Sequence, residues 1–254
     1  MFLAIDIGNT NITFGIYDGE SLGPRWRLAT GQGKTADEYG VYMLALIEYS
    51  GISASDIDSI AMASVVPPLT PVFMETCRQY LGIKPLVVDF ASRTGVKIRY
   101  EDPSQVGADR IVDAAACLNL HGAPACIVDF GTATTFDAVS SEGEYLGGAI
   151  APGVGIAAES LFERAAKLPK VDLLRPPSVI GKSIVHSLQS GLLYGYVGLV
   201  EGMVARFCSE LGPETIVVAT GGLAEVVAGE TDVITVVAPW LTLDGLRIVY
   251  ELNR

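Results

Sequence analysis

Two short stretches of this chain place an aspartate, a glycine and several small polar side chains directly after an apolar run. The first is Asp6-Ile7-Gly8-Asn9-Thr10-Asn11, and the second is Asp129-Phe130-Gly131-Thr132-Ala133-Thr134-Thr135. A glycine turn lets backbone N–H groups approach an anion closely, because no Cβ intervenes. A carboxylate beside such a turn can hold a cation directly or through water. These residue types together are typical of a site for nucleotide phosphates.

Taken singly, each stretch is ordinary turn chemistry and indicates only a turn. Their repetition changes that interpretation. The Asp and Gly of the first stretch match those of the second at one common offset, and Phe14 matches Phe136 once a slip of one residue is allowed. Self-similarity over half a chain predicts a duplicated domain rather than the short repeats of a solenoid.

A third candidate cluster is Gly107-Ala108-Asp109-Arg110, which lies between a strand-like run at 96–100 and an amphipathic helix expected from Ile111. A helix N-terminus attracts anions, and Arg110 can form a paired hydrogen bond to a carboxylate. Asp109 can accept a proton from a substrate hydroxyl. From the residues alone, however, the plainer reading is favoured, in which Asp109 caps the helix and Arg110 pairs at the surface.

Two other phosphate motifs fail or weaken on inspection. Gly181-Lys182-Ser183 looks like the end of a P-loop, but the glycine required five residues earlier is Pro176. A Gly-x-Gly-x-x-Ala run at 153–158 opens a helix, yet the proline before it argues against a dinucleotide fingerprint. Neither His121 nor His186 belongs to a hydrolase or zinc-protease motif.

Composition narrows the classes of partner. The chain has 254 residues and a formal net charge of -12, which argues against nucleic acid and anionic membranes as partners. Its four cysteines show no C-x-x-C spacing, so we expect small core residues rather than a zinc site. No basic leader precedes the first strand and no run reaches the roughly 18 apolar residues of a membrane span. We therefore expect a cytoplasmic protein.

Hydrophobic patterning predicts that strands and helices are mixed in both halves of the chain. We expect a hairpin at 2–17 with its turn at 8–11, strands at 59–66, 96–100, 126–131, 135–139, 145–150 and 215–219, and helices at 35–49, 69–81, 185–211 and 241–252. A chain of this length admits two domains. We place them at 1–120 and 121–254.

Four glycines of the long expected helix fall on nearly one face: Gly191, Gly195, Gly198 and Gly202. Small residues at this spacing let a second helix approach closely. The face can serve packing within the domain or form the seam of a dimer, and the sequence leaves both readings open.

In combination, these motifs resemble the type III pantothenate kinases, and the likeness runs through nearly the whole chain. The two phosphate stretches, the Gly107–Arg110 cluster, the run at 147–153 and Thr220-Gly221-Gly222 carry it. The resemblance implies the superfamily of acetate and sugar kinases, heat-shock 70 proteins and actin. The implied fold is α/β, with duplicated ribonuclease H-like (actin/hexokinase-like) domains, mixed sheets flanked by helices, and an interdomain cleft.

The function implied by the resemblance is ATP-dependent phosphorylation of pantothenate to 4′-phosphopantothenate, the first step of coenzyme A biosynthesis. It makes Asp109 the general base, which reverses the plainer reading above. It assigns ATP binding to Asp6, Ile7, Gly8, Asn9, Thr10, Asn11, Ile12, Thr13, Thr132, Gly221 and Gly222. It assigns the substrate to Tyr100, Gly107, Ala108, Asp109, Arg110 and Ile184.

The expected cofactors are Mg²⁺, held by Asp6 directly or through water, and K⁺ or NH₄⁺ at Asp129. We also expect a homodimer. One departure is Ile184, because the family usually has a threonine there and isoleucine offers no side-chain hydrogen bond. Two alternatives stay open: a kinase of the same superfamily acting on another small hydroxy or acid substrate, and a non-catalytic regulatory protein of the same fold.

Overall fold

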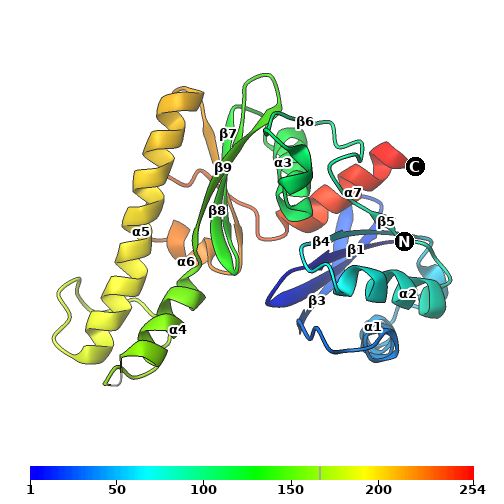
Figure 1. The fold of residues 1–254 in the computed structure, drawn as a ribbon, viewed down its shortest axis with the longest axis horizontal. Coiled ribbons are helices and arrows are strands. Elements are labelled where there is room, and N and C mark those ends of the chain that lie inside the picture. Colours follow the sequence, from blue (N-terminus) through cyan, green and yellow to red (C-terminus); the bar gives the residue numbers. More distant parts are fainter. Residues whose placement is uncertain (166) are drawn as a thin grey trace. The chain divides into compact units, whose positions relative to one another are not determined.

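The computed structural model describes residues 1–165 and 167–254, in which helices and strands are mixed along the chain (Figure 1). The helices are α1 (Ala36–Tyr49), α2 (Leu69–Leu81), α3 (Ala108–Leu120), α4 (Val154–Arg164), α5 (Ile184–Leu211), α6 (Ala224–Ala228) and α7 (Leu241–Asn253). The strands are β1 (Phe2–Ile7), β2 (Asn11–Asp18), β3 (Ser21–Ala29), β4 (Ser59–Ser64), β5 (Leu86–Val87), β6 (Lys97–Ile98), β7 (Ala125–Phe130), β8 (Ala133–Val139), β9 (Glu144–Pro152), β10 (Ile216–Gly221) and β11 (Val236–Val237).

The chain forms two compact units. The first contains Met1–Asn119 together with Leu241–Arg254, and the second contains Leu120–Trp240. The expected domains divide at the same place near residue 120 but include the terminal helix in the second domain. In the structure this helix, α7, packs within the first unit.

Three contacts explain where α7 packs. The ring of Tyr250 lies 5.0 Å from the ring of Phe2, and the Tyr17 hydroxyl donates a hydrogen bond to Asp244 at 2.7 Å. Gly15 leaves room for Leu243, because an added Cβ would lie 2.8 Å from its Cδ1 atom. An apolar face that fits the β1–β2 surface thus sets the position of the helix.

The first unit is built on a five-stranded sheet in the order β3-β2-β1-β4-β5. β1 is antiparallel to β2 and parallel to β4. Alternate residues of β1 point to opposite faces. Leu3, Ile5 and Ile7 are fully buried and belong to the core that α1 and α2 complete, whereas Phe2 contacts α7 on the other face.

The second unit repeats this order of strands. β9-β8-β7-β10-β11 corresponds position by position to β3-β2-β1-β4-β5, with β7 antiparallel to β8 and parallel to β10. Cys126, Val128 and Phe130 face a core that α5 completes with Val197 and Val200. The predicted duplication is confirmed, and the fold is α/β with two mixed sheets.

The hairpins also explain the slip of one residue. In the first, Ile7 pairs with Ile12, and in the second Phe130 pairs with Thr134. The second turn is therefore one residue shorter, and this places Phe14 and Phe136 at equivalent buried positions.

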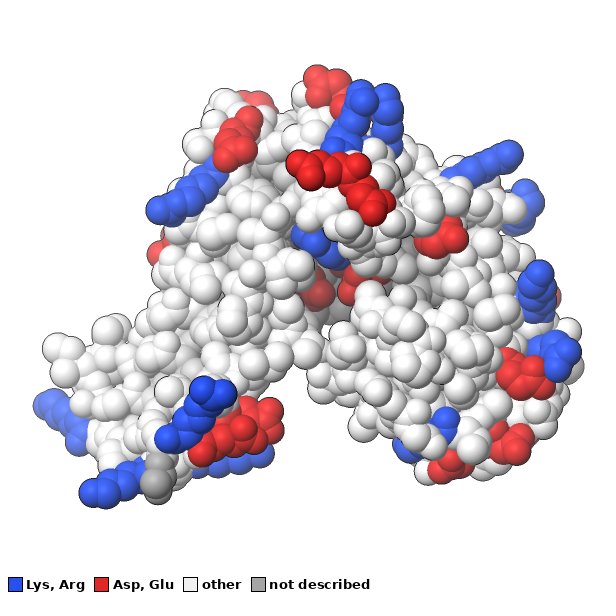
Figure 2. Space-filling view, in the orientation of Figure 1, with Lys and Arg blue, Asp and Glu red and all other residues white. Residues whose placement is uncertain are grey.

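Other features follow the sequence less closely. α3 begins at Ala108, three residues before the start expected at Ile111, so Asp109 and Arg110 belong to its first turn. Cys77, Cys117 and Cys126 are buried, as expected of core residues. On the face drawn in Figure 2, basic side chains are scattered among acidic ones in each unit. Among the described residues, no helix is long and apolar enough to cross a membrane.

Candidate active site

The first phosphate stretch is a tight turn between β1 and β2. The Gly8 N–H donates to the carbonyl of Asn11 at 3.0 Å, which closes the turn. Asn9, Thr10 and Asn11 are exposed, whereas Ile7 and Ile12 are buried on either side. The turn can therefore offer polar side chains and backbone groups to a ligand, while its two isoleucines anchor it in the core.

Thr30, just after β3, holds this turn from the side. Its hydroxyl donates to the Gly8 carbonyl at 2.7 Å, and its N–H donates to the Thr10 carbonyl at 3.0 Å. Tyr39 of α1 in turn brackets the next residue, since its hydroxyl accepts from the Gly31 N–H and donates to the Gly31 carbonyl, each at 3.0 Å. The sequence analysis missed Thr30, because nothing in the local pattern shows that β3 ends beside the turn.

Asp109 lies in the first turn of α3, beside Gly107. Because α3 begins at Ala108, Asp109 does not occupy the cap position, and its Oδ1 atom accepts a hydrogen bond from the Arg110 N–H at 2.8 Å. A Cβ on Gly107 would lie 2.5 Å from this same oxygen, so a larger residue there would have to displace the Asp109 carboxylate. Burial raises the pKa of the Asp109 carboxyl, and the N–H and charge of Arg110 oppose that rise.

One contact chain connects the Asp109 segment with the first phosphate stretch. A Cβ on Gly107 would lie 3.5 Å from Val65 Cγ1, and the Val65 N–H donates to the Ile7 carbonyl at 3.1 Å. Asp6 precedes Ile7 and lies on the same face of β1 as Phe2, the face that α7 covers. Gly245 of α7 in turn packs against the backbone of α3. The first unit therefore brings Asp6 and Asp109 to the same side of its sheet.

The second phosphate stretch forms the turn between β7 and β8. The Gly131 N–H donates to the Ala133 carbonyl at 3.0 Å, and the Gly153 N–H donates to the Thr132 carbonyl at 3.2 Å. A Cβ on Gly153 would collide with the carbonyl oxygens of Gly131 and Thr132. Glycine at the start of α4 thus serves close backbone packing on the turn, which explains the Gly-x-Gly run without a dinucleotide.

Asp129 lies between two glycines of this unit. A Cβ on Gly131 would lie 3.3 Å from its Oδ2 atom, and a Cβ on Gly221 would overlap its Oδ1 atom. Gly221 also has a φ of 88°, a conformation that favours glycine. Gly222 donates its N–H to the Phe130 carbonyl at 3.2 Å. The Thr220-Gly221-Gly222 segment therefore packs directly against Asp129.

The register of the second sheet aligns further polar residues. Thr220 is the partner of Asp129 on β10, and Thr135 is its partner on β8, so the three side chains form a row on one face. Asp137 follows Thr135 on that face and receives a hydrogen bond from its hydroxyl at 3.1 Å. The sequence analysis did not single out Asp137, although a carboxylate inside an apolar strand is itself a signal.

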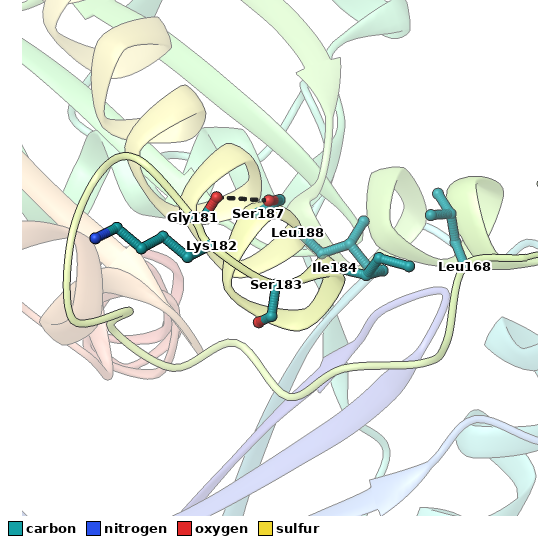
Figure 3. Close-up of a pocket in the computed structure, with 7 residues that line it drawn as sticks. All are labelled: Leu168, Gly181, Lys182, Ser183, Ile184, Ser187 and Leu188. Atoms are coloured by element: carbon teal, nitrogen blue, oxygen red, sulfur yellow. Dashed lines mark hydrogen bonds between the residues drawn. The ribbon is translucent and has the colours of Figure 1, made fainter.

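The two remaining substrate candidates lie in different units. Tyr100 belongs to the first unit and is 37% exposed. Ile184 is the first residue of α5, in the second unit, and lines a shallow hollow with Leu168, Lys182 and Ser183 (Figure 3). The Ser183 hydroxyl caps this helix by accepting the His186 N–H at 3.2 Å, and the Ser187 hydroxyl donates to the Gly181 carbonyl at 3.4 Å.

Neither Asp6 nor Asp129 belongs to a metal site whose ligands all come from described side chains of the protein. Within the described residues, no group of three or more His, Cys, Asp or Glu side chains could hold a metal. Mg²⁺ commonly binds through one or two carboxylates, with phosphate oxygens and water as its other ligands. A single carboxylate at Asp6 fits that pattern, and the carboxylate and hydroxyl oxygens around Asp129 suit a hard cation.

Solved structures share this fold. A Campylobacter jejuni protein described as a Baf family transcriptional activator aligns with a TM-score of 0.65 and 19% identity, over 99% of this chain and 98% of that one. A Sinorhizobium meliloti protein described as a 2-dehydro-3-deoxygalactonokinase aligns with a TM-score of 0.53 and 11% identity, over 99% and 97% of the two chains. At such identities these likenesses show the fold alone.

Sequence comparisons are more specific. The family model for type III pantothenate kinase matches residues 2–206. Proteins named type III pantothenate kinase from Moorella thermoacetica and from Roseiflexus sp. (strain RS-1) are 54% and 52% identical to this chain, and each alignment covers 100% of both proteins. The chain therefore belongs to the type III pantothenate kinase family.

Proposed function

We propose that this pantothenate kinase uses Asp109 as the general base when the primary hydroxyl of pantothenate attacks the γ-phosphate of ATP. The product is 4′-phosphopantothenate, and because ATP is plentiful in the cytoplasm we place the activity there. The observation that carries the proposal is the environment of Asp109. Its carboxyl lies in the first turn of a helix, and burial of this carboxyl raises its pKa. A raised pKa makes a carboxylate a better proton acceptor near neutral pH.

The chemistry asks for positioning more than for a strong base. Phosphoryl transfer passes through a loose transition state, so the attacking hydroxyl loses its proton late. Arg110 donates its N–H to Asp109 and so orients the carboxylate. Its guanidinium is a suitable partner for the carboxylate of pantothenate, and Tyr100 and Ile184 complete the proposed substrate contacts.

Each phosphate stretch contributes its own contacts to ATP. In the first, residues 6–13 offer backbone N–H groups and the exposed side chains of Asn9, Thr10 and Asn11. In the second, Thr132 contacts the phosphates, with Gly221 and Gly222 toward the adenosine. Mg²⁺ held beside Asp6 would neutralise phosphate charge during transfer.

A monovalent cation is the proposed partner of Asp129. The Asp129 carboxylate is enclosed by Gly131 and Gly221, and its row neighbours Thr220 and Thr135 bear hydroxyl oxygens. Oxygen ligands of this kind suit K⁺. In a protein with a net charge of -12, a bound cation would help to offset the charge of the triphosphate.

The homodimer is proposed to form through α5. Gly191, Gly195 and Gly198 are exposed on this helix, and among the described atoms outside the helix backbone nothing lies within 4 Å of a Cβ built on them. Packing inside the unit therefore does not account for the glycine face, whereas close approach of a second copy does. Between its ends, the side of α5 seen in Figure 2 bears few charged side chains, which suits such an interface.

A substitution pair tests the dimer. Gly195→Leu should shift the sedimentation coefficient toward that of a monomer, because the larger side chain prevents close approach. Gly155→Leu is the matched control, since Gly155 is also an exposed helical glycine with open space at its Cβ position. Equal sedimentation of the two variants would count against α5 as the interface.

A coupled ATP assay tests the reaction itself. Pantothenate should support ADP formation, while hexoses and acetate should not. Asp109→Asn should lower kcat by roughly 10²- to 10⁴-fold, the usual contribution of a general base, with little change in the dissociation constant for pantothenate. Transfer to a hexose or acetate in place of pantothenate would refute the substrate, and an active Asp109→Asn enzyme would refute the base.

A further inference from the structure

Asp137 is a buried carboxylate next to the proposed cation site, and nothing above gives it a role. It is 1% exposed, and each of its oxygens accepts a hydroxyl hydrogen. Oδ2 accepts from Thr135 at 3.1 Å, and Oδ1 accepts from Tyr145 at 2.7 Å. Burying a carboxylate is costly unless it is hydrogen-bonded, so this arrangement calls for an explanation.

The consequence for Thr135 follows from its chemistry. A threonine hydroxyl has one hydrogen to donate and two lone pairs. Because Asp137 takes the hydrogen, the Thr135 oxygen keeps only lone pairs for any other neighbour. In this structure the Thr135 oxygen can therefore accept a hydrogen bond or coordinate a cation, and its hydroxyl has no hydrogen left to donate to phosphate.

The partner that such an oxygen prefers is set by what lies beside it. Thr135 is the cross-strand partner of Asp129, so their side chains point to the same face as near neighbours. An acceptor oxygen next to a carboxylate repels phosphate and attracts a hard cation.

The first unit provides a comparison within the same molecule. Thr13 is the partner of Asp6 there, at the position equivalent to Thr135. The residue equivalent to Asp137 is Gly15, whose open side is filled by Leu243 and Leu22. The position two residues after Thr13 therefore holds no carboxylate, so this arrangement belongs to the second unit. The duplication thus kept the hairpin and changed the chemistry of one copy.

We propose that Asp137 is a positioning residue that fixes the Thr135 hydroxyl as an oxygen ligand for the monovalent cation held by Asp129. The inference deepens the proposed function, on which it rests for the identity of the ion. Thr135 touches the cation, and Asp137 acts through Thr135.

The test measures binding of K⁺ rather than turnover. Thermal unfolding of the full chain is followed while KCl replaces tetramethylammonium chloride at constant ionic strength, with and without a non-hydrolysable ATP analogue. A ligand that binds only the folded state raises Tm with its concentration. Thr135→Val should raise the K⁺ concentration needed for a given rise in Tm by roughly threefold to tenfold, the usual effect of one lost polar contact. Asp137→Asn should do the same.

Two control variants separate this role from a structural one. Thr135→Ser keeps the hydroxyl and should keep the wild-type K⁺ dependence. Tyr145→Phe removes the other donor to Asp137 and should lower stability without changing the K⁺ concentration needed for a given rise in Tm. If Asp137→Asn fails to fold, the nearly isosteric Thr135→Val still decides the matter.

The outcomes are distinct from those that test the kinase reaction. Wild-type K⁺ dependence in Thr135→Val would overturn the proposal, and so would a wild-type protein whose Tm ignores K⁺ under both conditions. In either case, pantothenate-dependent ADP formation that is lost in Asp109→Asn would still support the proposed function.

Discussion

The Thr30 hydroxyl donates a 2.7 Å hydrogen bond to the Gly8 carbonyl across a separation of 22 residues. Thr30 also donates its N–H to the Thr10 carbonyl, so one residue holds the first phosphate turn at two points. Both carbonyls are thereby satisfied from the β3 side, while the Gly8 N–H closes the turn on the Asn11 carbonyl. Thr30, which follows β3, thus helps to set the conformation of the first phosphate turn.

Thr30→Val should therefore weaken binding of ATP. The substitution keeps the shape of the side chain and leaves the Gly8 carbonyl without its partner, which costs about 0.5–1.5 kcal/mol. If the lost hydrogen bond destabilises the conformation of the turn that binds ATP, KM for ATP rises roughly twofold to twelvefold while KM for pantothenate changes little. Thr30→Ser is the control and should behave like wild type. A Thr30→Val enzyme with unchanged KM for ATP would show that the turn keeps its shape without this bond.

Gly221→Ala should displace the Asp129 carboxylate. The added Cβ would overlap Asp129 Oδ1 and lie 2.7 Å from the backbone of Phe130, at a φ of 88°. Gly212 is a matched control, because its φ is 106° but nothing described lies within 4 Å of its Cβ position. The backbone strain of about 1–2 kcal/mol is common to both variants, so their difference reports the contacts with Asp129 and with the Phe130 backbone.

Chemical denaturation and the K⁺ titration measure that difference. Gly221→Ala should lose more free energy of unfolding than Gly212→Ala and should also bind K⁺ more weakly. Equal losses with unchanged K⁺ binding would mean that the Asp129 carboxylate moves aside freely.

The raised pKa of Asp109 predicts how stability depends on pH. In the range above the unfolded value of about 3.9 and up to the folded pKa, the folded protein holds a proton that the unfolded chain has released. The free energy of unfolding therefore falls as pH rises through this range. Asp109→Asn cannot ionise and escapes the loss, although its amide oxygen can still accept the Arg110 N–H.

The expected result is that Asp109→Asn is more stable than wild type at neutral pH and that the gain shrinks toward pH ~4. Urea denaturation at several pH values in ligand-free protein measures it. A variant with no gain at neutral pH would mean that the carboxylate is well solvated after all. Combined with the expected loss of kcat, the gain would mark Asp109 as a residue kept for activity at a cost in stability.

The sequence predicts the two hairpins and their slip because both depend on local chemistry. Each apolar run is followed by a glycine turn, and the residues that end the two runs, Ile7 and Phe130, are buried in the structure. The start of α3 at Ala108 is harder to foresee, because Gly107 has no side-chain oxygen that would mark it as the cap of a helix. The interdomain cleft implied by the resemblance stays a prediction.

The features that the sequence did not predict depend on contacts between residues far apart in the chain. Thr30 and Asp137 could not be assigned from the sequence, since one depends on where β3 ends and the other on the cross-strand register that pairs Asp129 with Thr135. The terminal helix shares its unit with residues that precede it by more than 200 positions, such as Tyr17. Contacts such as the fit of Leu243 beside Gly15 show which sheet it covers.

Ile184 allows a last prediction about substrate binding. It is the first residue of α5 and is 54% exposed, so Ile184→Thr should change stability little. If this position contacts pantothenate, the new hydroxyl adds one hydrogen bond and lowers KM for pantothenate by roughly twofold to twelvefold, with KM for ATP unchanged. Ser183→Ala tests the alternative in which Ser183 makes the contact with pantothenate. This substitution also removes the helix cap, at a cost of about 1 kcal/mol in stability. A KM for pantothenate that responds to Ser183→Ala beyond this loss of stability, and not to Ile184→Thr, would move the contact from the isoleucine to the serine.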